Sequence, residues 1–175
     1  MTPSVRRAIQ ADEPAIDELI QRALAQYRDV DELMHLGYLR YSLGARHAPG
    51  AEQLVAEMNR KVAGSVLFDR RVRHHSNWPR TLASFGTLMV DPSQRRRGIG
   101  AALVSACIDR AREEGATGLA IDTMPFMTAA LEFYGPFGFE RWPAGDWDGT
   151  PLLQELIGRL DAPRTIVSAW RIEFD

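Results

Sequence analysis

The sequence predicts one domain of the α/β (α+β) class, spanning residues 1–175. Runs rich in β-branched and aromatic residues alternate along the chain with stretches that are apolar at helical spacing, and no linker divides them. The 175 residues are enough to bury a real core, and 45% apolar and 25% charged residues are typical of a soluble globular protein. A strand, a turn and the start of a helix over residues 90–104 organise the rest of the chain.

The first half of the chain predicts a strand, two helices and a pair of strands. Asp12 is a suitable N-cap for the first helix, and Pro14 fits its first turn. The apolar positions of that helix form one face, made of Ile16, Leu19, Ile20, Ala23 and Leu24. Polar residues 59–61 separate two β-type runs and predict a hairpin. The expected elements are a strand over residues 4–9, helices over 12–27 and 31–42, and strands over 53–58 and 62–73.

The second half predicts four more strands and three more helices. Gly115 closes the helix that follows Gly98, and Gly135-Pro136 breaks the helix that begins at Pro125. The final run alternates in polarity and is able to pair within the sheet or across a dimer, so the oligomeric state stays open between a monomer and a homodimer. The expected strands cover residues 81–90, 118–123, 137–142 and 166–174, and the expected helices cover 98–115, 125–134 and 152–160, with a loop before the last helix.

Composition and charge argue against several classes of protein. The formal net charge of −2 disfavours a nucleic-acid surface, and no apolar run approaches the ~20 residues that span a bilayer. The single Cys107 rules out an internal disulfide and suits a reducing compartment. The first residues have no long apolar core, so we expect no signal peptide and a cytoplasmic protein. We also expect no metal site.

The stretch from Val90 to Val104, VDPSQRRRGIGAALV, predicts an anion site at the start of a helix. The first turn of a helix has unpaired backbone N–H groups and the positive end of the helix dipole, both of which attract anions. Gly98 and Gly100 lack a Cβ, so a bulky ligand is able to approach the backbone closely. The three arginines at 95–97 add positive charge at the same place. These features suit an anion the size of a pyrophosphate.

Two nucleotide-binding motifs do not match this stretch. A dinucleotide-binding loop, G-x-G-x-x-G, requires a third glycine where this chain has Leu103. A P-loop requires a lysine after its last glycine, and the one lysine of the chain is Lys61.

The residues from Val90 to Gly100 closely resemble the acetyl-CoA-binding motif of the GCN5-related N-acetyltransferase (GNAT) superfamily. That motif reads roughly V-x-P-x-x-[RQ]-x-x-G-x-G/A, and its defined positions fall here on Val90, Pro92, Arg95, Gly98 and Gly100. A second stretch, ALEFYGPFGFE, is similar to the later signature of the same family, with Ala130, Tyr134, Gly138 and Phe139 in register. The order of the expected elements also fits, and the resemblance covers about residues 5–142.

The resemblance implies a fold, a cofactor and the residues that bind it. The implied fold is the GNAT acyl-CoA N-acyltransferase fold, a mixed, mostly antiparallel sheet of six to seven strands with helices on both faces. The implied cofactor is acetyl-CoA, which serves as the acyl donor, with no metal. Its pantetheine arm would pair with the strand that ends at Val90, and its pyrophosphate would lie on backbone N–H groups of residues 95–101. The implied cofactor-binding residues are Leu88, Met89, Val90, Arg95, Arg96, Arg97, Gly98, Ile99, Gly100, Ala101 and Tyr134.

The resemblance also implies how the reaction is catalysed. Tyr134 matches the usual general acid, which protonates the leaving thiolate as a tetrahedral intermediate collapses, and a backbone N–H near Val90 would stabilise the oxyanion. Many relatives have a glutamate on the strand before the motif, but residues 81–89 contain no acid. Glu57, on an adjacent predicted strand, is the best substitute as general base, and water held by Ser84 or Thr87 is the alternative. Met127 also departs from the family, in which this position is commonly an asparagine that contacts the cofactor.

The acceptor site is expected between the first two helices and the loops near the last strand. The aromatic and acidic residues expected there suit a cationic amine: Tyr27, Asp29, Asp31, Glu32, His35, Trp142, Asp146, Trp147 and Asp148. The expected function is therefore direct transfer of an acetyl group to a primary amine of a small molecule or amino-acid-like acceptor. Two alternatives stay open, a domain that binds CoA without catalysis and a protein or peptide N-acetyltransferase.

Overall fold

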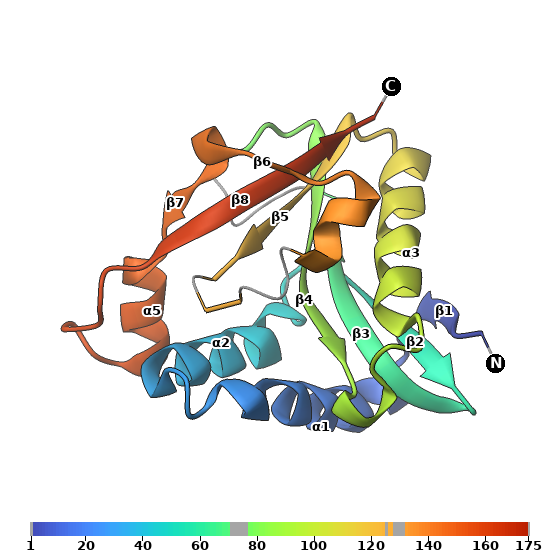
Figure 1. The fold of residues 1–175 in the computed structure, drawn as a ribbon, viewed down its shortest axis with the longest axis horizontal. Coiled ribbons are helices and arrows are strands. Elements are labelled where there is room, and N and C mark those ends of the chain that lie inside the picture. Colours follow the sequence, from blue (N-terminus) through green and yellow to red (C-terminus); the bar gives the residue numbers. More distant parts are fainter. Residues whose placement is uncertain (1, 71–76, 125, 128–131, 175) are drawn as a thin grey trace.

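The computed structural model describes residues 2–70, 77–124, 126–127 and 132–174, and it shows a twisted sheet with helices on both faces (Figure 1). The strand order is β1-β2-β3-β4-β5-β8-β6, and β7 pairs with β8. Among the described strands only the β4–β5 pair is parallel, so the mixed, mostly antiparallel sheet is confirmed, with eight strands instead of six to seven. The strands are β1 (Ser4–Arg7), β2 (Glu52–Met58), β3 (Lys61–Asp69), β4 (Leu82–Val90), β5 (Gly118–Thr123), β6 (Glu140–Arg141), β7 (Trp147–Asp148) and β8 (Ile166–Glu173).

Helices α1 (Glu13–Leu24), α2 (Glu32–Ala45) and α5 (Thr150–Ile157) lie on one side of the sheet, and α3 (Ile99–Glu113) lies on the other (Figure 1). The whole predicted apolar face of α1 is buried, and it packs against Val55 and Met89 of the sheet. Helix α2 buries no such stripe, because it lies between α1, α5 and the interior and is partly covered on several sides. No helix in the described part of the chain is long and apolar enough to cross a membrane.

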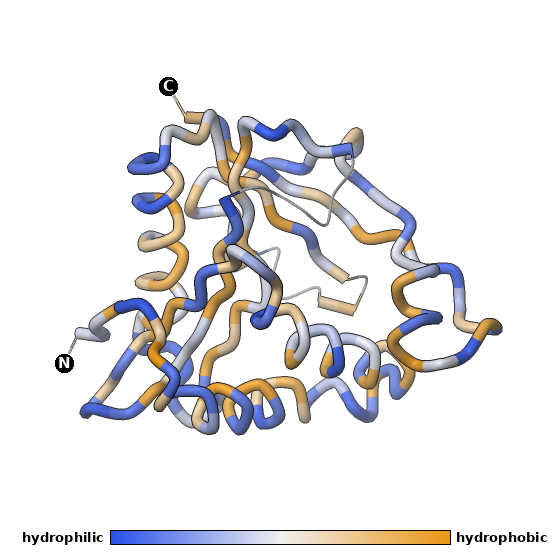
Figure 2. The backbone as a smooth tube through the Cα atoms, turned by 180° about the vertical axis from the view of Figure 1, so that it is seen from behind, coloured by the Kyte–Doolittle hydropathy of each residue, from blue (hydrophilic) through white to orange (hydrophobic). Residues whose placement is uncertain are grey.

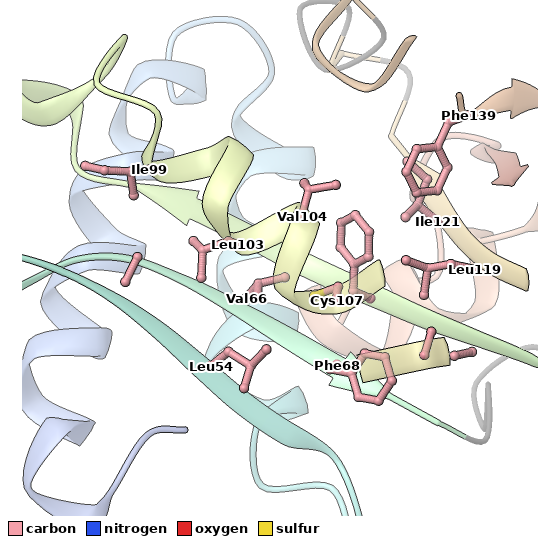
Figure 3. Packing of buried hydrophobic residues seen from close by; sticks show 14 of the residues in the cluster. Leu54, Val66, Phe68, Ile99, Leu103, Val104, Cys107, Leu119, Ile121 and Phe139 are labelled. Carbon is pink, nitrogen blue, oxygen red and sulfur yellow. The ribbon is translucent and has the colours of Figure 1, made fainter. Parts of the chain in front are cut away.

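The main core lies between α3 and strands β2 to β5. Figure 3 shows Leu103, Val104 and Cys107 of α3 in one buried cluster with side chains of the sheet, among them Val66 and Phe68 of β3. All five are essentially excluded from solvent. In Figure 2 hydrophilic and hydrophobic residues alternate along the helices, which is typical of helices with one face on the core and the other in solvent. Burial of the Cys107 thiol raises its pKa, so this cysteine is a structural residue.

Several element boundaries differ from those expected. The hairpin turn is tighter, because Asn59 and Arg60 both adopt positive φ and Met58 pairs directly with Lys61. Strand β3 ends at Asp69, and the expected continuation to residue 73 enters residues outside the described ranges. Half of the expected helix over 125–134 falls outside them; of the described half, residues 126–127 are not helical and residues 132–134 are. The expected strand over 137–142 begins only at Glu140, because residues 135–137 form a 3-10 turn, and the expected loop contains β7.

The last strand completes the sheet within the chain. β8 pairs with β5 over six residue pairs and with the short strands β6 and β7 on its other edge. Helix α5 ends at Ile157 instead of near residue 160, because Gly158 adopts a left-handed conformation (φ 70°) and closes the helix.

The first turn of α3 lies very close to β3, and Gly64 allows that approach. A Cβ at Gly64 would lie 2.6 Å from Ile99 Cγ2, 3.0 Å from Leu103 Cδ1 and 3.1 Å from the carbonyl oxygen of Met89. No side chain fits there without displacing the helix, so this glycine determines where α3 begins relative to the sheet.

We expect Gly64→Ala to lower the free energy of unfolding by about 1–3 kcal/mol, because the added methyl group overpacks the α3–β3 contact. Gly44→Ala is the matched control: a Cβ at Gly44 meets nothing within 4 Å, and alanine favours the helix by up to about 1 kcal/mol. Denaturant unfolding of both variants tests the contact, and an equal effect of the two substitutions would contradict it.

Candidate active site

Strands β4 and β5 begin side by side and then separate (Figure 1). Their parallel pairing covers only Leu82 with Gly118, Ala83 with Leu119 and Ser84 with Ala120. Beyond these pairs β4 stays bound to β3, and β5 stays bound to β8. A cavity of about 800 Å³ occupies the gap, lined by residues 85–90 of β4, residues 121–123 of β5 and Met124 directly after β5. A cavity of this size is typical of a small-molecule or cofactor site.

The β4 wall of the cavity contains a β-bulge. Ser65 of β3 pairs with Met89 and Leu67 pairs with Gly86, so the one residue between them on β3 lies opposite two residues of β4, Thr87 and Leu88. Thr87 lies in this bulge with a φ of 49°, a left-handed conformation that costs a β-branched residue on the order of 1–3 kcal/mol. The bulge interrupts pairing with β3 at the place where β5 has already moved away. Backbone groups of β4 therefore face the cavity.

The first turn of α3 forms one end of the cavity. Gly98 is the N-cap with a φ of 79°, Arg96 before it has a φ of 62°, and no side chain caps the helix. Residues 98–101 all line the cavity, so the open N–H groups of the helix lie at its wall. A Cβ at Gly100 would lie 3.0 Å from the Phe133 ring and 3.6 Å from Val90, which shows how little space this position leaves.

Asp91 holds the turn that leads into α3. Its carboxylate accepts hydrogen bonds from the backbone N–H of Ser93 (2.9 Å) and from the Ser93 hydroxyl (2.8 Å), and it pairs with Arg22 at 3.0 Å. Burial opposes ionisation of this carboxyl, but the bonds from Ser93 and the charge of Arg22 outweigh it and hold the pKa of Asp91 below its ordinary value.

The three arginines of the motif have different positions. Arg95 and Arg96 line the cavity, and Arg95 donates a hydrogen bond to Gln26 at 3.0 Å. Arg97 is not among the lining residues and binds Gln94 at 2.6 Å. The structure thus brings every expected cofactor-binding residue to this one cavity except Arg97.

Tyr134 lines the same cavity and belongs to an aromatic cluster. Its ring lies 5.9 Å from that of Phe85, 5.2 Å from that of Phe133 and 5.7 Å from that of Phe139. Burial raises the pKa of Tyr134 well above its ordinary value, and nearby ionisable groups, Cys107 first, raise it further. The phenol therefore keeps its proton throughout the neutral range and is able to donate it.

The other end of the cavity has a carboxylate that the sequence analysis did not select. Asp122 of β5 lines this end and accepts a hydrogen bond from the Trp147 indole N–H at 3.2 Å. Tyr38 and Tyr41 of α2 line it too, and burial raises the pKa of both phenols. In the sequence Asp122 sits within a buried strand, GLAIDT, where a lone acid among apolar residues was the available signal.

The expected base and most of the expected acceptor residues lie elsewhere. Glu57 is bound by Arg6, with Arg6 Nε at 3.1 Å and Nη2 at 2.5 Å from Oε1, beside the edge strand β1, and it does not line the cavity. Thr87 lines the cavity, whereas Ser84 does not. Of the nine expected acceptor residues only Tyr27 and Trp147 line it, and helix α5 forms the remaining wall with Leu152, Leu153 and Leu156. The described residues contain no cluster of three or more side chains suited to a metal ion.

Comparison with known sequences gives one family and one curated relative. A family model described as acetyltransferase (GNAT) family matches residues 15–139. An uncharacterized N-acetyltransferase of Methanocaldococcus jannaschii, MJ1207, is 34% identical over 92 residues, a match that covers 50% of this chain. The match covers only 38% of that protein, so the chain spans well under half the length of this relative.

Solved structures with the same architecture come from several bacteria. The GCN5-related N-acetyltransferase of Rhodopseudomonas palustris has a TM-score of 0.72 at 15% identity, covering 99% of this chain and 97% of its own. The ribosomal-protein-S18-alanine N-acetyltransferase of Escherichia coli has a TM-score of 0.65 at 17% identity, covering 98% and 94%. The protein yncA of Salmonella typhimurium, determined with its cofactor acetyl-CoA, has a TM-score of 0.63 at 22% identity, covering 100% and 95%. At these identities the similarity shows a shared fold.

We expect Asp91→Asn to destabilise the protein in a pH-dependent way. Because the folded pKa of Asp91 lies below the ~3.9 of an unfolded aspartate, its stabilisation is complete above that value and is lost as the pH falls through the folded pKa. At pH 7 the free energy of unfolding of the variant should be about 1–3 kcal/mol lower than that of the wild type. This difference should shrink below about pH 4. Urea unfolding across pH 3–8 measures this, with the exposed Asp109→Asn as the control. A difference that persists unchanged at pH 3 would argue against the ionised carboxylate.

Proposed function

The chain belongs to the acetyltransferase (GNAT) family, and from this premise we propose that it transfers an acetyl group from acetyl-CoA directly to the primary amine of a small molecule. One observation carries the proposal: a single cavity joins the open N-terminus of α3 to the phenol of Tyr134. A direct transfer needs donor and acceptor in one space, with an anion site for the cofactor and a proton donor at the reacting end.

The residues around α3 fit the phosphate groups of acetyl-CoA. The backbone N–H groups of residues 98–101 would bind the pyrophosphate, aided by the positive end of the helix dipole. Arg95 and Arg96 add positive charge at the same end. The unpaired edge of β4, from Leu88 to Val90, would hydrogen-bond the extended pantetheine arm as a further strand does. Bound in this way, acetyl-CoA supplies an activated acetyl thioester.

Tyr134 is suited to the role of general acid. Its ring is fixed by Phe85, Phe133 and Phe139, and its raised pKa keeps the phenol protonated. A proton held at this oxygen is available to the sulfur that leaves as the acetyl group is transferred. Backbone N–H groups at the β4 bulge supply donors for the negative charge that develops on the carbonyl oxygen.

Helix α5 favours a small acceptor over a peptide. Leu152, Leu153 and Leu156 line the cavity at the end opposite α3, and Met34 packs against Leu153 behind them. A polypeptide acceptor would need an open groove at this place. The side chains of α5 occupy it, so the acceptor is a molecule small enough to enter the cavity.

We expect Gly100→Val to weaken acetyl-CoA binding by at least about tenfold, since its methyl groups would fill the narrow space beside Phe133 and Val90. Isothermal titration calorimetry with acetyl-CoA measures the effect, and circular dichroism checks the fold. Gly44→Val is the matched control, because a side chain at Gly44 meets nothing within 4 Å. Unchanged affinity in Gly100→Val would remove the α3 N-terminus as the cofactor site.

We expect Tyr134→Phe to lower kcat by about 100-fold and to leave the affinity for acetyl-CoA within about twofold, because the ring remains and only the proton donor is lost. Release of CoASH with a panel of primary amines measures kcat, and calorimetry measures the affinity. Full activity in the variant would exclude Tyr134 as the acid. If the wild-type protein binds acetyl-CoA but turns over with no amine, the chain is a CoA-binding domain and not a transferase.

A further inference from the structure

The two ends of the cavity carry opposite charge. Arg95 and Arg96 line the end formed by α3. At the far end Asp122 is the one carboxylate, and no basic residue accompanies it among the described lining residues. The phenols of Tyr38, Tyr41 and Tyr134 remain neutral because burial raises their pKa values. Negative charge at the far end therefore comes from Asp122.

Asp122 lies at the point where the sheet opens. It is two residues beyond Ala120, the last residue of β5 that pairs with β4, and it pairs with Ala169 of β8 on the other side. Since side chains alternate along a strand, Asp122 shares the face of Ala120, which packs with Leu82 and Ala169. Tyr134 belongs to the opposite face, with the core around α3. The carboxylate and the phenol thus approach the gap from different sides.

Trp147 orients the carboxylate. Its indole N–H donates to Asp122 Oδ2 at 3.2 Å, and its own position is fixed by pairing of β7 with β8. A hydrogen bond to one oxygen of a carboxylate limits rotation of the group. Both side chains line the cavity, so the oriented carboxylate faces the space in which an acceptor would lie.

The walls around Asp122 are apolar and aromatic. Leu152, Leu153 and Leu156 come from α5, Tyr38 and Tyr41 come from α2, and Met124 and Val167 line the same end. Such walls bind an apolar body, and aromatic faces also attract a cationic amine. A second charged group on the acceptor would find no partner among the described lining residues, which is costly in a space of low dielectric constant.

We propose that Asp122 binds the acceptor amine and accepts its proton during transfer, and that this end of the cavity selects a primary amine on an apolar body. This inference rests on the proposed acetyltransferase function and names its base and its substrate class. An amino acid would bring a carboxylate next to Asp122, and a diamine would bring a second ammonium against the leucines. Both are disfavoured relative to an alkylamine or arylalkylamine.

The proton balance follows from these two residues. The bound ammonium first gives one proton to the Asp122 carboxylate, which releases it to solvent. The lone pair of the neutral amine then forms the new C–N bond, and the C–S bond breaks with its electron pair left on sulfur. Nitrogen gives one proton to the Asp122 carboxylate, and Tyr134 gives its phenolic proton to sulfur. Return of a proton from Asp122 to Tyr134 through solvent restores both groups, so the net products are the N-acetyl amine and CoASH.

The test compares three amine probes and one charge-removing variant. 2-Phenylethylamine is the apolar monoamine, phenylalanine adds a carboxylate to the same body, and 1,4-diaminobutane adds a second amine. We expect the wild-type kcat/KM for 2-phenylethylamine to exceed that for either other probe by at least about tenfold. We expect Asp122→Asn to lose about 100-fold in this kcat/KM and to bind acetyl-CoA within about twofold of wild type. Asp109→Asn, at an exposed site on α3, should match wild type.

Calorimetry with 2-phenylethylamine alone gives a readout that does not depend on turnover. We expect binding to the wild-type protein and at least about tenfold weaker binding to Asp122→Asn. Equal amine binding and equal turnover in the two proteins would overturn the inference, as would a preference for phenylalanine or 1,4-diaminobutane. If the wild-type protein does not bind acetyl-CoA, that result would instead overturn the proposed function.

Trp147→Phe tests the positioning role. It keeps an aromatic ring, smaller than the indole, and the Asp122 charge but removes the hydrogen-bond donor. We expect kcat to fall by about tenfold with little change in KM for the amine, since the carboxylate still attracts the amine but loses the hydrogen bond that orients its Oδ2 atom. An unchanged kcat would exclude the role of Trp147, and a rise in KM alone would show that the ring only lines the pocket.

Discussion

Two neighbouring parallel strands that stop pairing inside a protein leave backbone N–H and C=O groups that need another partner. Strands β4 and β5 do this beyond Ser84 and Ala120. The gap persists because each strand is held on its outer side, β4 by β3 and β5 by β8. Within the same stretch of β4, the bulge at Thr87 also interrupts the pairing with β3. The cavity and the backbone groups that line it both result from this separation.

The position of α3 gives one end of the gap a positive character. Gly64 lets the first turn of the helix lie directly on β3, and Asp91 holds the turn that enters it. The open N–H groups of the helix consequently lie at one end of the cavity, where Arg95 and Arg96 also lie. Asp122 lies at the other end. The charge distribution of the cavity therefore follows from where one helix begins and where one strand pairing ends.

The sequence is enough to predict a helix or strand when the pattern of apolar residues and the residues that end the element lie within the element itself. The buried face of α1, from Ile16 to Leu24, matches its helical spacing, and Gly115 closes α3 with a positive φ. The cavity wall formed by α2 and α5 was not predictable in this way, because Tyr38 and Leu153 line the same space only as a result of the packing of α2 near α5. The order of the strands alone favours Glu57 as a base, but its environment is decided by Arg6 on the neighbouring edge strand. Asp122, the one acid in GLAIDT, stands out as a candidate site residue only in the structure, where β4 no longer pairs with β5 beyond Ala120.

Alternation along β5 also determines from which sides the two proposed proton-transfer groups, Asp122 and Tyr134, reach the cavity. Ile121 packs with the core on the α3 side, so Asp122, the next residue, faces the other side. Tyr134 reaches the cavity from the α3 side, where Phe85 and Phe139 hold its ring. A direct transfer forms one bond and breaks another at the same carbon, so the incoming nitrogen and the departing sulfur need separate proton partners. A gap between two strands with opposite faces supplies such partners from two sides, and neither side chain has to cross the space that the substrates occupy.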